Sequence, residues 1–475
     1  MDSSTSNDFV SGDNSATTTN GHTLGNGHST PKSNSQSDHS TMIEPYDLIC
    51  VGFGPASLSI AIAHHDRRLD SSSRILYLEK QSSFAWHAGM LLPGSRMQIS
   101  FIKDLASLRD PRSHFTFLNY LHQNNRLIHF TNLGTFLPLR EEYNDYLTWC
   151  ASHFVDSVRY GETVHAVNPV RLNGQGPVTM FEVQSTDANG VTQTRTARHV
   201  VLAVGGRPNI PTVFPTNDKR IIHSSAYASV VASVLGDREA PYKVAVVGAG
   251  QSAAEIYADL HSRYPNCHTR LIIRRQALKP SDDSPFVNEI FNPEKVDELY
   301  SLPSDDRTAA IRRDKDTNYG VVRIELLERL YEDLYSQRLR DPNEKNWVHN
   351  IVPLTDVASV QPNASNSKLR VCMKNIRSGM ESKEDFDAII VATGYIRDIY
   401  QTILASTRDL LKKDATGCEC WSVGRDYKLQ YDIDKVADNA GIWLQGCCEV
   451  THGLSDTLLS ILAVRGGEMV DSIFG

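Results

Sequence analysis

The sequence contains no long hydrophobic run. None of its apolar stretches reaches the roughly 18 to 20 residues that a helix needs to cross a bilayer. The N-terminus also lacks a basic segment followed by an apolar one, which is the pattern of a secretory signal. The formal net charge of −8 over 475 residues is mild and gives no electrostatic footprint for nucleic acid. We therefore expect a soluble protein without a membrane or nucleic-acid partner.

Paired cysteines are scarce as well. The chain has eight cysteines, but no two of them have the CxxC spacing of metal-binding and redox pairs. Cys418 and Cys420 stand one residue apart, and Cys447 adjoins Cys448. This pattern indicates reduced thiols in a cytoplasmic protein rather than a disulfide framework. It also predicts no metal site.

Large apolar side chains are almost absent from residues 1–42, where Ser, Thr, Asn, Gly and His dominate. A chain of this composition cannot bury enough apolar surface to offset the entropy that it loses on ordering. We predict a disordered tail here. An apolar run that begins at Pro45 marks the start of the ordered chain.

After residue 45 the chain contains two copies of a strand–helix–strand pattern. The first comprises residues 46–51, 56–65 and 74–79, and the second comprises 242–247, 252–263 and 269–274. In both copies, short apolar runs flank a segment of helical periodicity, which is the βαβ pattern of a parallel sheet. We predict an α/β fold with two Rossmann-like dinucleotide-binding domains.

A glycine-rich turn joins the first strand of each copy to its helix. Glycines here permit a tight turn and let a pyrophosphate approach the free N–H groups of the helix N-terminus. The first turn has a serine where the usual fingerprint has its third glycine, but the strand before it and the helix after it support the assignment. The two turns are Gly52-Phe53-Gly54-Pro55-Ala56-Ser57 and Gly248-Ala249-Gly250-Gln251-Ser252-Ala253.

The end of the second strand carries opposite charges in the two copies. Glu79 ends it in the first copy, and Arg274 and Arg275 end it in the second. A carboxylate at this place accepts hydrogen bonds from ribose hydroxyls and repels a 2′-phosphate, whereas guanidinium groups suit that phosphate. The pattern therefore predicts FAD in the first domain and NADPH in the second. The alternative for the two arginines is a pair of solvated charges at a strand end.

Three further segments complete the predicted organisation. Residues 386–391 form an apolar strand that leads into Ala392-Thr393-Gly394-Tyr395 and is expected beside the first domain. The segment 280–340 follows neither sheet pattern, ends in an amphipathic helix over 321–337 and suits a mainly helical substrate-binding region. A last helix is predicted from Ser455, whose hydroxyl suits an N-cap. We expect the FAD domain at 43–212 and 386–475, and the NADPH domain at 213–385.

Several longer motifs carry a resemblance to a known family. With the first glycine turn and the 392–395 motif, they make residues 43–475 similar to the flavin-dependent N-hydroxylating monooxygenases, and within these to the fungal L-ornithine N5-monooxygenases of hydroxamate siderophore synthesis. The FxGxxxHxxxY/W signature of the wider flavin monooxygenases survives only as His223-Ser224-Ser225-Ala226-Tyr227, which argues against a Baeyer–Villiger enzyme. The motifs are Met97-Gln98-Ile99-Ser100-Phe101-Ile102-Lys103-Asp104-Leu105, Arg109-Asp110-Pro111-Arg112-Ser113, Pro280-Ser281-Asp282-Asp283-Ser284-Pro285-Phe286-Val287-Asn288-Glu289, Asn318-Tyr319-Gly320-Val321-Val322 and Thr451-His452-Gly453-Leu454-Ser455-Asp456.

The resemblance implies the N5-hydroxylation of L-ornithine with NADPH and O2. In the family, NADPH reduces FAD, and a C4a-hydroperoxyflavin passes its distal oxygen to the terminal amine of the substrate. That amine must be neutral, because an ammonium has no lone pair. The likeness also implies a homotetramer. L-lysine or a diamine stays open as the substrate, and a flavoprotein that only binds its cofactors is the distant alternative. The missing redox cysteine pair excludes a pyridine-nucleotide disulfide oxidoreductase.

The resemblance also implies residue roles. It assigns Lys103 to the substrate carboxylate, Asn288 and Asn318 to the amino-acid end, and Ser460 to the neighbourhood of the side-chain amine. Taken alone, a lysine is usually solvated and an asparagine usually forms a turn or a cap, so these roles depend on the motif matches. No side chain is assigned the chemical step itself; Gln98 and Ser460 are the candidates for it.

The cofactor contacts expected from the glycine turns and the resemblance form two sets. Core packing is the alternative for Trp86 and His87, and helix capping is the alternative for Ser252. The expected FAD contacts are Gly52, Gly54, Pro55, Ser57, Glu79, Lys80, Trp86, His87, Gln98, Thr393, Gly394, Ser455 and Leu458. The expected NADPH contacts are Gly248, Gly250, Gln251, Ser252, Arg274, Arg275 and Asn288.

Overall fold

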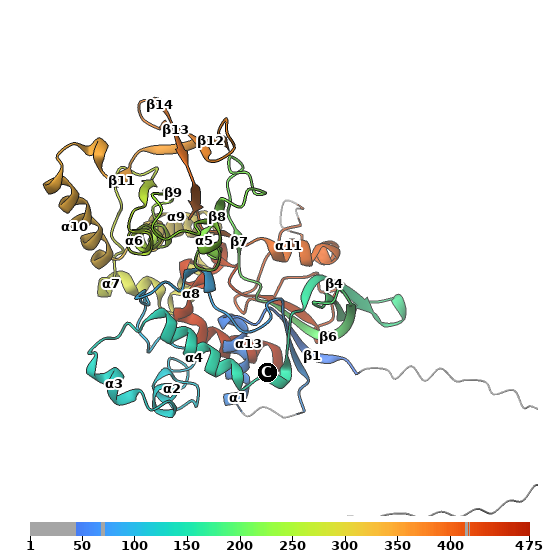
Figure 1. Cartoon of the computed structure of the whole chain (residues 1–475). Helices are drawn as coiled ribbons and strands as arrows, with labels where there is room; N and C mark the ends of the chain where they lie inside the picture. Colours follow the sequence, from blue (N-terminus) through green and yellow to red (C-terminus); the bar gives the residue numbers. More distant parts are fainter. Residues whose placement is uncertain (1–43, 68–71, 414–416, 418) are drawn as a thin grey trace, which may run out of the picture. The chain divides into compact units, whose positions relative to one another are not determined.

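Both predicted βαβ units are present in the structure, a computed structural model that describes residues 44–67, 72–413, 417 and 419–475 (Figure 1). The predicted tail at 1–42 lies outside these described residues. The bounds of the two units differ from the predicted ranges by no more than two residues at any end. The first unit is β1 (Tyr46–Val51), α1 (Pro55–Asp66) and β2 (Ile75–Glu79), and the second is β9 (Lys243–Val247), α6 (Gln251–Arg263) and β10 (His268–Ile272).

A seven-stranded sheet organises the first domain. Its order is β3-β2-β1-β6-β5-β4, with β17 also paired to β6. The N-terminal half of the long strand β6 pairs with the antiparallel β5, and its C-terminal half lies between the parallel strands β1 and β17. The remaining strands are β3 (Val158–Tyr160), β4 (Thr163–Arg171), β5 (Val178–Thr186), β6 (Thr192–Leu202) and β17 (Gly441–Leu444).

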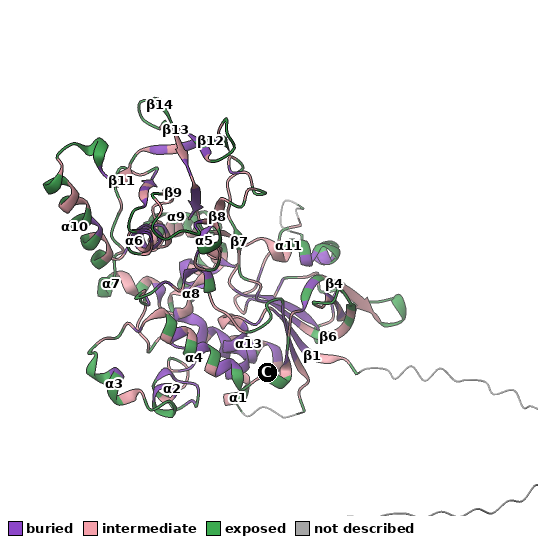
Figure 2. Cartoon of the chain, viewed as in Figure 1, coloured by how far each residue is buried: buried purple, intermediate pink, exposed green. Residues whose placement is uncertain are grey.

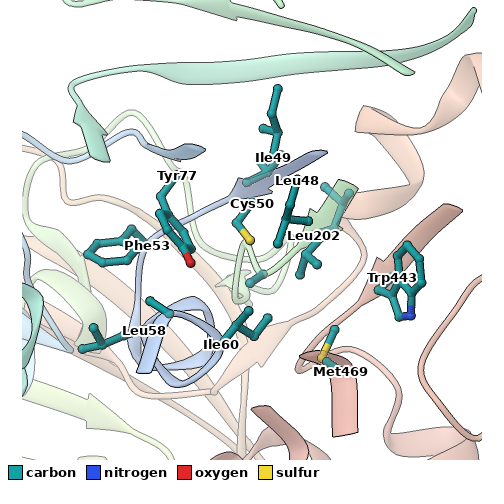
Figure 3. Close-up of a cluster of buried hydrophobic side chains, with 14 of the residues drawn as sticks. Leu48, Ile49, Cys50, Phe53, Leu58, Ile60, Tyr77, Leu202, Trp443 and Met469 are labelled. Carbon is teal, nitrogen blue, oxygen red and sulfur yellow. The ribbon is translucent and has the colours of Figure 1, made fainter. Parts of the chain in front are cut away.

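The core of this domain surrounds β1. Leu48, Ile49 and Cys50 are fully buried, as a strand covered on both faces requires. Figure 3 shows these side chains near α1, together with Trp443 of β17 and Met469 of the C-terminal helix α13 (Leu462–Phe474). Truncation of a fully buried tryptophan costs about 3–5 kcal/mol. The C-terminal residues are therefore an integral part of the first domain.

The second domain is built on a five-stranded parallel sheet of order β11-β10-β9-β15-β8. Apolar residues of three helices cover one face of it, and a three-stranded antiparallel sheet covers the other. The parallel strands added here are β8 (Ile221–His223), β11 (His349–Val352) and β15 (Ala388–Val391). The helices are α5 (Tyr227–Val234), α6 and α10 (Ile324–Arg340), and the antiparallel strands are β12 (Thr355–Pro362), β13 (Leu369–Asn375) and β14 (Glu381–Phe386).

The position of β15 shifts the expected boundary between the domains. The sequence predicts that 386–475 belongs to the first domain, but β15 is hydrogen-bonded to β9 and β8 of the second sheet. Because β15 belongs to the second sheet, the second domain extends to Val391, and the C-terminal part of the first domain begins after it. The chain then crosses back through β16 (Tyr395–Ile396), which pairs with β7 (Arg207–Pro208) of the outward crossing. The two crossings therefore form one short ribbon.

The predicted helix from Ser455 begins later than expected. Two short 3-10 turns at Leu454–Thr457 and Leu459–Ile461 come first, and α13 starts at Leu462. Leu458 lies between the turns with an extended backbone, at φ −103° and ψ 157°, which interrupts the helix. Ser455 therefore does not cap α13. The turns are instead tied to α13 by a buried ion pair of 2.8 Å between Asp456 and Arg465.

The segment 280–340 is mainly helical, as predicted, and its last helix is α10. The helices α8 and α9 of this segment pack against α12, so that it contacts the C-terminal part of the first domain. One face of α10 is exposed (Figure 2). The helices added here are α2 (Phe117–Gln123), α3 (Leu127–Asn132), α4 (Arg140–Ser152), α7 (Pro285–Asn288), α8 (Lys295–Ser301), α9 (Ser304–Asp314), α11 (Ile399–Ile403) and α12 (Glu449–His452).

A short segment of the first domain is buried in the second. Met90 and Leu92 belong to the apolar cluster of α5 and α6, with exposed fractions of 5% and 6%. Gly89 makes this approach possible, because a Cβ added to it would lie 1.9 Å from the carbonyl oxygen of Ser225. The segment 88–92 therefore anchors one domain in the core of the other.

Two general properties concern the described residues only. None of their helices combines the length and the apolar character needed to span a bilayer. Their cysteines are free thiols, namely Cys50, Cys150, Cys267, Cys372, Cys420, Cys447 and Cys448.

Candidate functional site

The first glycine turn leaves the N-terminus of α1 open to an anion. Gly52 has a φ of 92°, and a Cβ added to it would lie 2.5 Å from the carbonyl oxygen of Ala203. Gly54 is the N-cap of α1, where no side chain caps the helix and no acidic residue occupies the first turn. A Cβ at Gly54 would meet no atom within 4 Å. Free backbone N–H groups beside open space fit a pyrophosphate.

Glu79 holds this turn in place. Its Oε2 accepts a hydrogen bond of 2.7 Å from the backbone N–H of Phe53, and its Oε1 accepts one of 2.9 Å from Gln81. The side chain is buried, with an exposed fraction of 6%. An ionised carboxylate has about four acceptor positions, so these two bonds leave capacity for ribose hydroxyls. The spacing in the sequence predicts the carboxylate but not its bond to the glycine turn.

Among the described residues, the buried hydroxyls of Ser57, Tyr257, Ser281 and Ser460 have no hydrogen-bond partner. Ser57 lies in the first turn of α1, and Tyr257 lies on α6 within the core of the second domain. The other two concern the substrate region. They belong to Ser460, in the turn before α13, and to Ser281, at the start of the 280–340 segment. Buried hydroxyls are nearly always hydrogen-bonded, and leaving one unpaired costs about 1–3 kcal/mol. The orphaned groups of Ser281 and Ser460 therefore fit a site that is completed by ligand or water. Ser460 is a predicted site residue, whereas sequence reasoning missed Ser281.

Trp86 and His87 stand where the two domains meet. The Trp86 ring is half-buried, with its centroid 5.9 Å from that of Tyr143. His87 has a left-handed backbone, at φ 46°, and its ring centroid lies 5.3 Å from Trp86 and 6.1 Å from Tyr395 of the crossing ribbon. These contacts pack the His87 ring against two aromatic neighbours, while the residue stays exposed to solvent.

The remaining predicted FAD residues divide by burial. Lys80 and Gln98 are exposed, and Met97 beside Gln98 is buried. Ser455 is buried with an exposed fraction of 2%, and Leu458 is half-buried. Exposure leaves Gln98 and Lys80 free to meet a ligand, whereas Met97 is packed in the core of the first domain.

Thr393 and Gly394 shape the crossing between the domains. The Thr393 hydroxyl donates to the carbonyl oxygen of Asn209. The Gly394 carbonyl oxygen accepts a hydrogen bond from the Asn209 N–H and lies 3.0 Å from Nε2 of His223. Gly394 has a φ of 81°, which favours glycine. The remnant of the wider monooxygenase signature at His223 thus serves as a structural contact of this crossing.

The second glycine turn repeats the geometry of the first. Gly248 has a φ of 143°, and a Cβ added to it would lie 2.4 Å from the carbonyl oxygen of Ala392. Gly250 is the N-cap of α6, again without a capping side chain or an acid in the first turn. Ser252 is therefore not the cap of this helix. The open N-terminus fits a second pyrophosphate.

The two predicted phosphate-binding arginines differ in their surroundings. The side chain of Arg274 is 72% exposed and forms an ion pair of 2.9 Å with Asp356. Arg275 is 31% exposed; it donates to Asp316 at 2.8 Å and to the carbonyl oxygen of Gly320 at 3.3 Å. Arg275 thus holds the turn that carries Asn318, while Arg274 is accessible from solvent.

Three of the four predicted substrate residues lie around the C-terminal turns. The hydroxyl of Tyr319, next to Asn318, donates to Glu449 and lies 3.2 Å from the Thr457 hydroxyl. The turn that follows Asn288 packs against residues 454–457. Asn288 also donates to the carbonyl oxygen of Asp283 at 2.9 Å, which leaves its amide oxygen available. The structure therefore gathers Asn288 and Asn318 near the segment of Ser460.

Lys103 is a half-buried cation in the loop before α2. Among the described residues, no carboxylate lies within ion-pair distance of its Nζ, and no hydrogen bond links it to Asn288, Asn318 or Ser460. Burial lowers the pKa of the Lys103 ammonium. A partly desolvated ammonium without an acidic partner fits an anionic ligand group.

Two uncapped helix N-termini follow parallel strands, one beside a buried carboxylate and the other beside two arginines, one of them exposed. This arrangement defines a two-dinucleotide-domain oxidoreductase. Comparison with known proteins narrows this class. The chain belongs to the L-lysine 6-monooxygenase/L-ornithine 5-monooxygenase family, whose model matches residues 44–397.

Individual relatives are similar over nearly the whole chain. The L-ornithine N(5)-oxygenase of Arthrobotrys oligospora is 56% identical over 431 residues, which cover 90% of this chain and 88% of the relative. Among solved structures, the ornithine hydroxylase PvdA from Pseudomonas aeruginosa has a TM-score of 0.82 at 40% identity, covering 90% of this chain and 99% of its own. The ornithine N-hydroxylase of Kutzneria sp. 744, solved with reduced FAD, NADP+ and L-ornithine, has a TM-score of 0.82 at 34% identity, with the same coverage.

Proposed function

We propose that this protein hydroxylates the side-chain amine of L-ornithine with FAD, NADPH and O2, giving N5-hydroxy-L-ornithine for hydroxamate siderophore synthesis. The observation that carries the proposal is Lys103, a half-buried cation without an acidic partner among the described residues. A free amino acid offers a carboxylate to such a cation, whereas a diamine has none. The similarity to L-ornithine N(5)-oxygenases supports ornithine over lysine.

The proposal assigns one cofactor to each glycine turn. FAD fits the first turn, with its pyrophosphate at the N-terminus of α1 and its ribose at Glu79. NADPH fits the second, and Arg274 is the better partner for its 2′-phosphate because Arg275 is committed to Asp316 and Gly320. When both are bound, they supply the reduced flavin that activates O2.

The side chains of the protein position the substrate for this chemistry. Lys103 binds the carboxylate, and the amides of Asn288 and Asn318 hold the amino-acid end. The orphaned hydroxyl of Ser460 is available to the terminal amine. That amine must lose its proton to become a nucleophile, and a site shielded from water favours its neutral form. The roles of these residues therefore lie in binding, orientation and exclusion of water.

The family resemblance implies a homotetramer, and we propose that α10 forms one of its subunit contacts. Its outer face exposes four large apolar or aromatic side chains, Ile324 (49%), Tyr331 (74%), Tyr335 (52%) and Leu339 (69%). Such a stripe is costly to leave in water and suits a subunit contact. Light scattering should give four times the mass of the chain, and Tyr331→Glu should reduce that mass. A monomeric wild-type protein would contradict the proposal. A cytoplasmic location stays a prediction of the cysteine pattern.

The first test is a substrate comparison with the purified protein. Hydroxylamine product, NADPH use, oxygen use and hydrogen peroxide are measured with L-ornithine, L-lysine and putrescine. We expect product with L-ornithine, coupled to NADPH oxidation. Product with L-lysine or putrescine alone would keep the chemistry and reject the substrate. NADPH oxidation that yields only peroxide with all three would reject the hydroxylation of these amines.

The role of Lys103 is tested by Lys103→Ala. The loss of a charge-assisted contact of about 1.5–3 kcal/mol predicts a 10- to 100-fold lower kcat/KM for L-ornithine. Flavin reduction by NADPH should change by less than about twofold, since Lys103 is not assigned to either cofactor. Lys374→Ala, at an exposed lysine of β13, is the matched control. Equal kcat/KM values in the Lys103 variant and the wild type would remove this residue from the substrate site.

A further inference from the structure

A largely buried ion pair connects the two domains about one helical turn from the open N-terminus of α6. Nη1 of Arg140, the first residue of α4, donates to Oε2 of Glu255 on α6 at a distance of 2.8 Å. The exposed fractions of the two side chains are 14% and 9%. Arg140 belongs to the first domain and Glu255 to the second. Because both groups are largely desolvated, loss of either partner strands a buried charge.

The second carboxylate oxygen of Glu255 extends this contact along α6. Oε1 accepts a hydrogen bond of 2.8 Å from Nε2 of Gln251, one helical turn earlier. Oε1 of Gln251 then accepts a bond of 2.9 Å from the backbone N–H of Arg323, where α10 begins. Arg323 directly follows the segment 318–322. These hydrogen bonds therefore connect the ion pair, through Gln251 at the N-terminus of α6, to Arg323 at the end of the segment that contains Asn318.

Arg140 extends the contact in the other direction. Its Nε donates to the carbonyl oxygen of Arg96 at 3.2 Å, and its backbone N–H donates to Ser95 at 2.8 Å. The same loop continues back through Met90 and Leu92, which are buried in the second domain, to His87. Arg140 thus connects two segments. One is the loop after Trp86 and His87, through Ser95 and Arg96, and the other is α6, which follows the second glycine turn.

The surroundings make this polar bridge important for the placement of the domains. Gln251, Glu255 and Arg323 line a cavity of about 910 Å³, whose other walls include the segment 92–96 and parts of α5 and α10. Where the cavity lies, the domains are not packed against each other. The apolar anchor at 88–92 and the Arg140–Glu255 pair both join the two domains at the edge of this cavity.

We propose that Glu255 is a positioning residue that fixes the nucleotide-binding end of α6 over the first domain and couples it to the substrate segment. This inference rests on the proposed function, because α6 is assigned to NADPH there. Hydride transfer needs the two rings within contact distance, and a misplacement of about 1 Å can cost about 100-fold in rate. Glu255 touches no reacting atom, so it acts through Gln251, Arg140 and Arg323.

The test compares Glu255→Gln, Glu255→Ala and the exchange Arg140→Glu with Glu255→Arg in the full-length holoenzyme. The rate of flavin reduction is measured by stopped flow at saturating NADPH, and peroxide per NADPH is measured with L-ornithine. We expect Glu255→Ala to reduce flavin at least 10-fold more slowly and to release more peroxide. Glu255→Gln, which keeps an acceptor for Gln251, should be less impaired, and the exchanged pair should recover part of the rate.

Asp259→Asn is the matched control. It breaks the Asp259–Arg263 pair of 2.7 Å one turn further along the same helix, but both partners lie within one domain. This variant should lose thermal stability while its reduction rate at saturating NADPH stays within about twofold of wild type.

Two outcomes would overturn the inference. One is a Glu255→Ala variant with a lower Tm and a wild-type reduction rate, which would make Glu255 a stabilising residue only. The other is an equal slowing in Asp259→Asn. If Glu255→Ala does not fold, Glu255→Gln and the exchanged pair decide the question by the same rate. A wild-type protein that NADPH does not reduce would contradict the proposed function instead.

Discussion

Each of the two glycine turns ends in an extended, uncapped N-cap glycine, but the turns differ in where their selective residue lies. Glu79 of the first is buried, with both carboxylate oxygens bonded to backbone N–H groups. Arg274 of the second is 72% exposed and shares one ion pair with Asp356. A glycine turn fixed by a buried residue suits a cofactor that stays bound through many turnovers. A glycine turn whose selective residue is exposed suits a nucleotide that binds and dissociates in each cycle.

We expect the largest effect from a substitution of Glu79 at the first glycine turn. Glu79→Ala leaves the buried N–H group of Phe53 without its acceptor, which costs about 1–3 kcal/mol. It also removes the bond from the N–H group of the exposed Gln81. We expect the variant to be purified with little FAD and with a clearly lower Tm, measured by flavin absorbance and by thermal melting. Glu79→Gln keeps one acceptor and should retain more FAD. A Glu79→Ala variant with full FAD content would show that the hydrogen bond between Glu79 and the first glycine turn is not needed for FAD binding.

A smaller effect separates the arginines of the second site. Arg274→Ala should lower kcat/KM for NADPH about 10- to 100-fold, as expected for a lost charge-assisted bond, and leave the value for NADH nearly unchanged. Arg275→Ala should instead raise the KM for L-ornithine, because it releases the turn that carries Asn318. Steady-state kinetics with both nucleotides distinguish the two. Equal losses with NADPH and NADH in the Arg274 variant would contradict the 2′-phosphate contact.

The smallest effect concerns buried histidines in the two domains. Burial lowers the pKa of His452 in the first domain and of His349 in the second from 6.5 to about 4. His349 also stacks on His261, with centroids 3.5 Å apart. Since the folded pKa lies below the unfolded one, the stabilisation is complete above pH 6.5 and is lost as the pH falls toward 4. As the pH falls from 6.5 to 5, the titration of each histidine should lower the free energy of unfolding by about 1–2 kcal/mol.

Thermal melts at pH 7.5 and 5.0 measure this loss. His349→Gln should show a smaller decrease in Tm on acidification than the wild type, because one proton-binding site of the unfolded state is removed. His122→Gln, at an exposed histidine, should behave like the wild type. An unchanged acid sensitivity in His349→Gln would show that the second domain does not titrate through this residue.

The parts of the fold that follow from local pattern were predictable. Short apolar runs around a glycine turn gave both βαβ units, because a parallel strand buried on both faces and an open helix N-terminus each leave a mark in consecutive residues. The position of β15 was not predictable in this way. Its apolar run fits either sheet, and only the tertiary pairing with β9 and β8 decides between them.

The candidate site was predictable to a similar degree. The charges of Glu79, Arg274 and Lys103 are visible in the sequence, but the bond from Phe53 to Glu79 and the ion pair of Arg274 with Asp356 join residues far apart in the chain. The orphaned hydroxyl of Ser281 and the bond between Glu255 and Arg140, 115 positions apart, leave no local signal. Likewise, neither the extended Leu458 that precedes the late start of α13 nor the buried Asp456–Arg465 pair is visible in the helical periodicity of that segment.

The pairing of β17 with β6 has a consequence for how the chain matures on the ribosome. The sheet that begins at β1 receives β17 and the covering helix α13 only after the whole second domain has been synthesised. Until then, the apolar face of α1 that meets α13 is uncovered, and the turn with Ser460 is missing. The second sheet also waits for β15, so neither domain can close before about four fifths of the chain has emerged. The first glycine turn therefore lies in a complete and covered sheet only after nearly the whole chain has been synthesised.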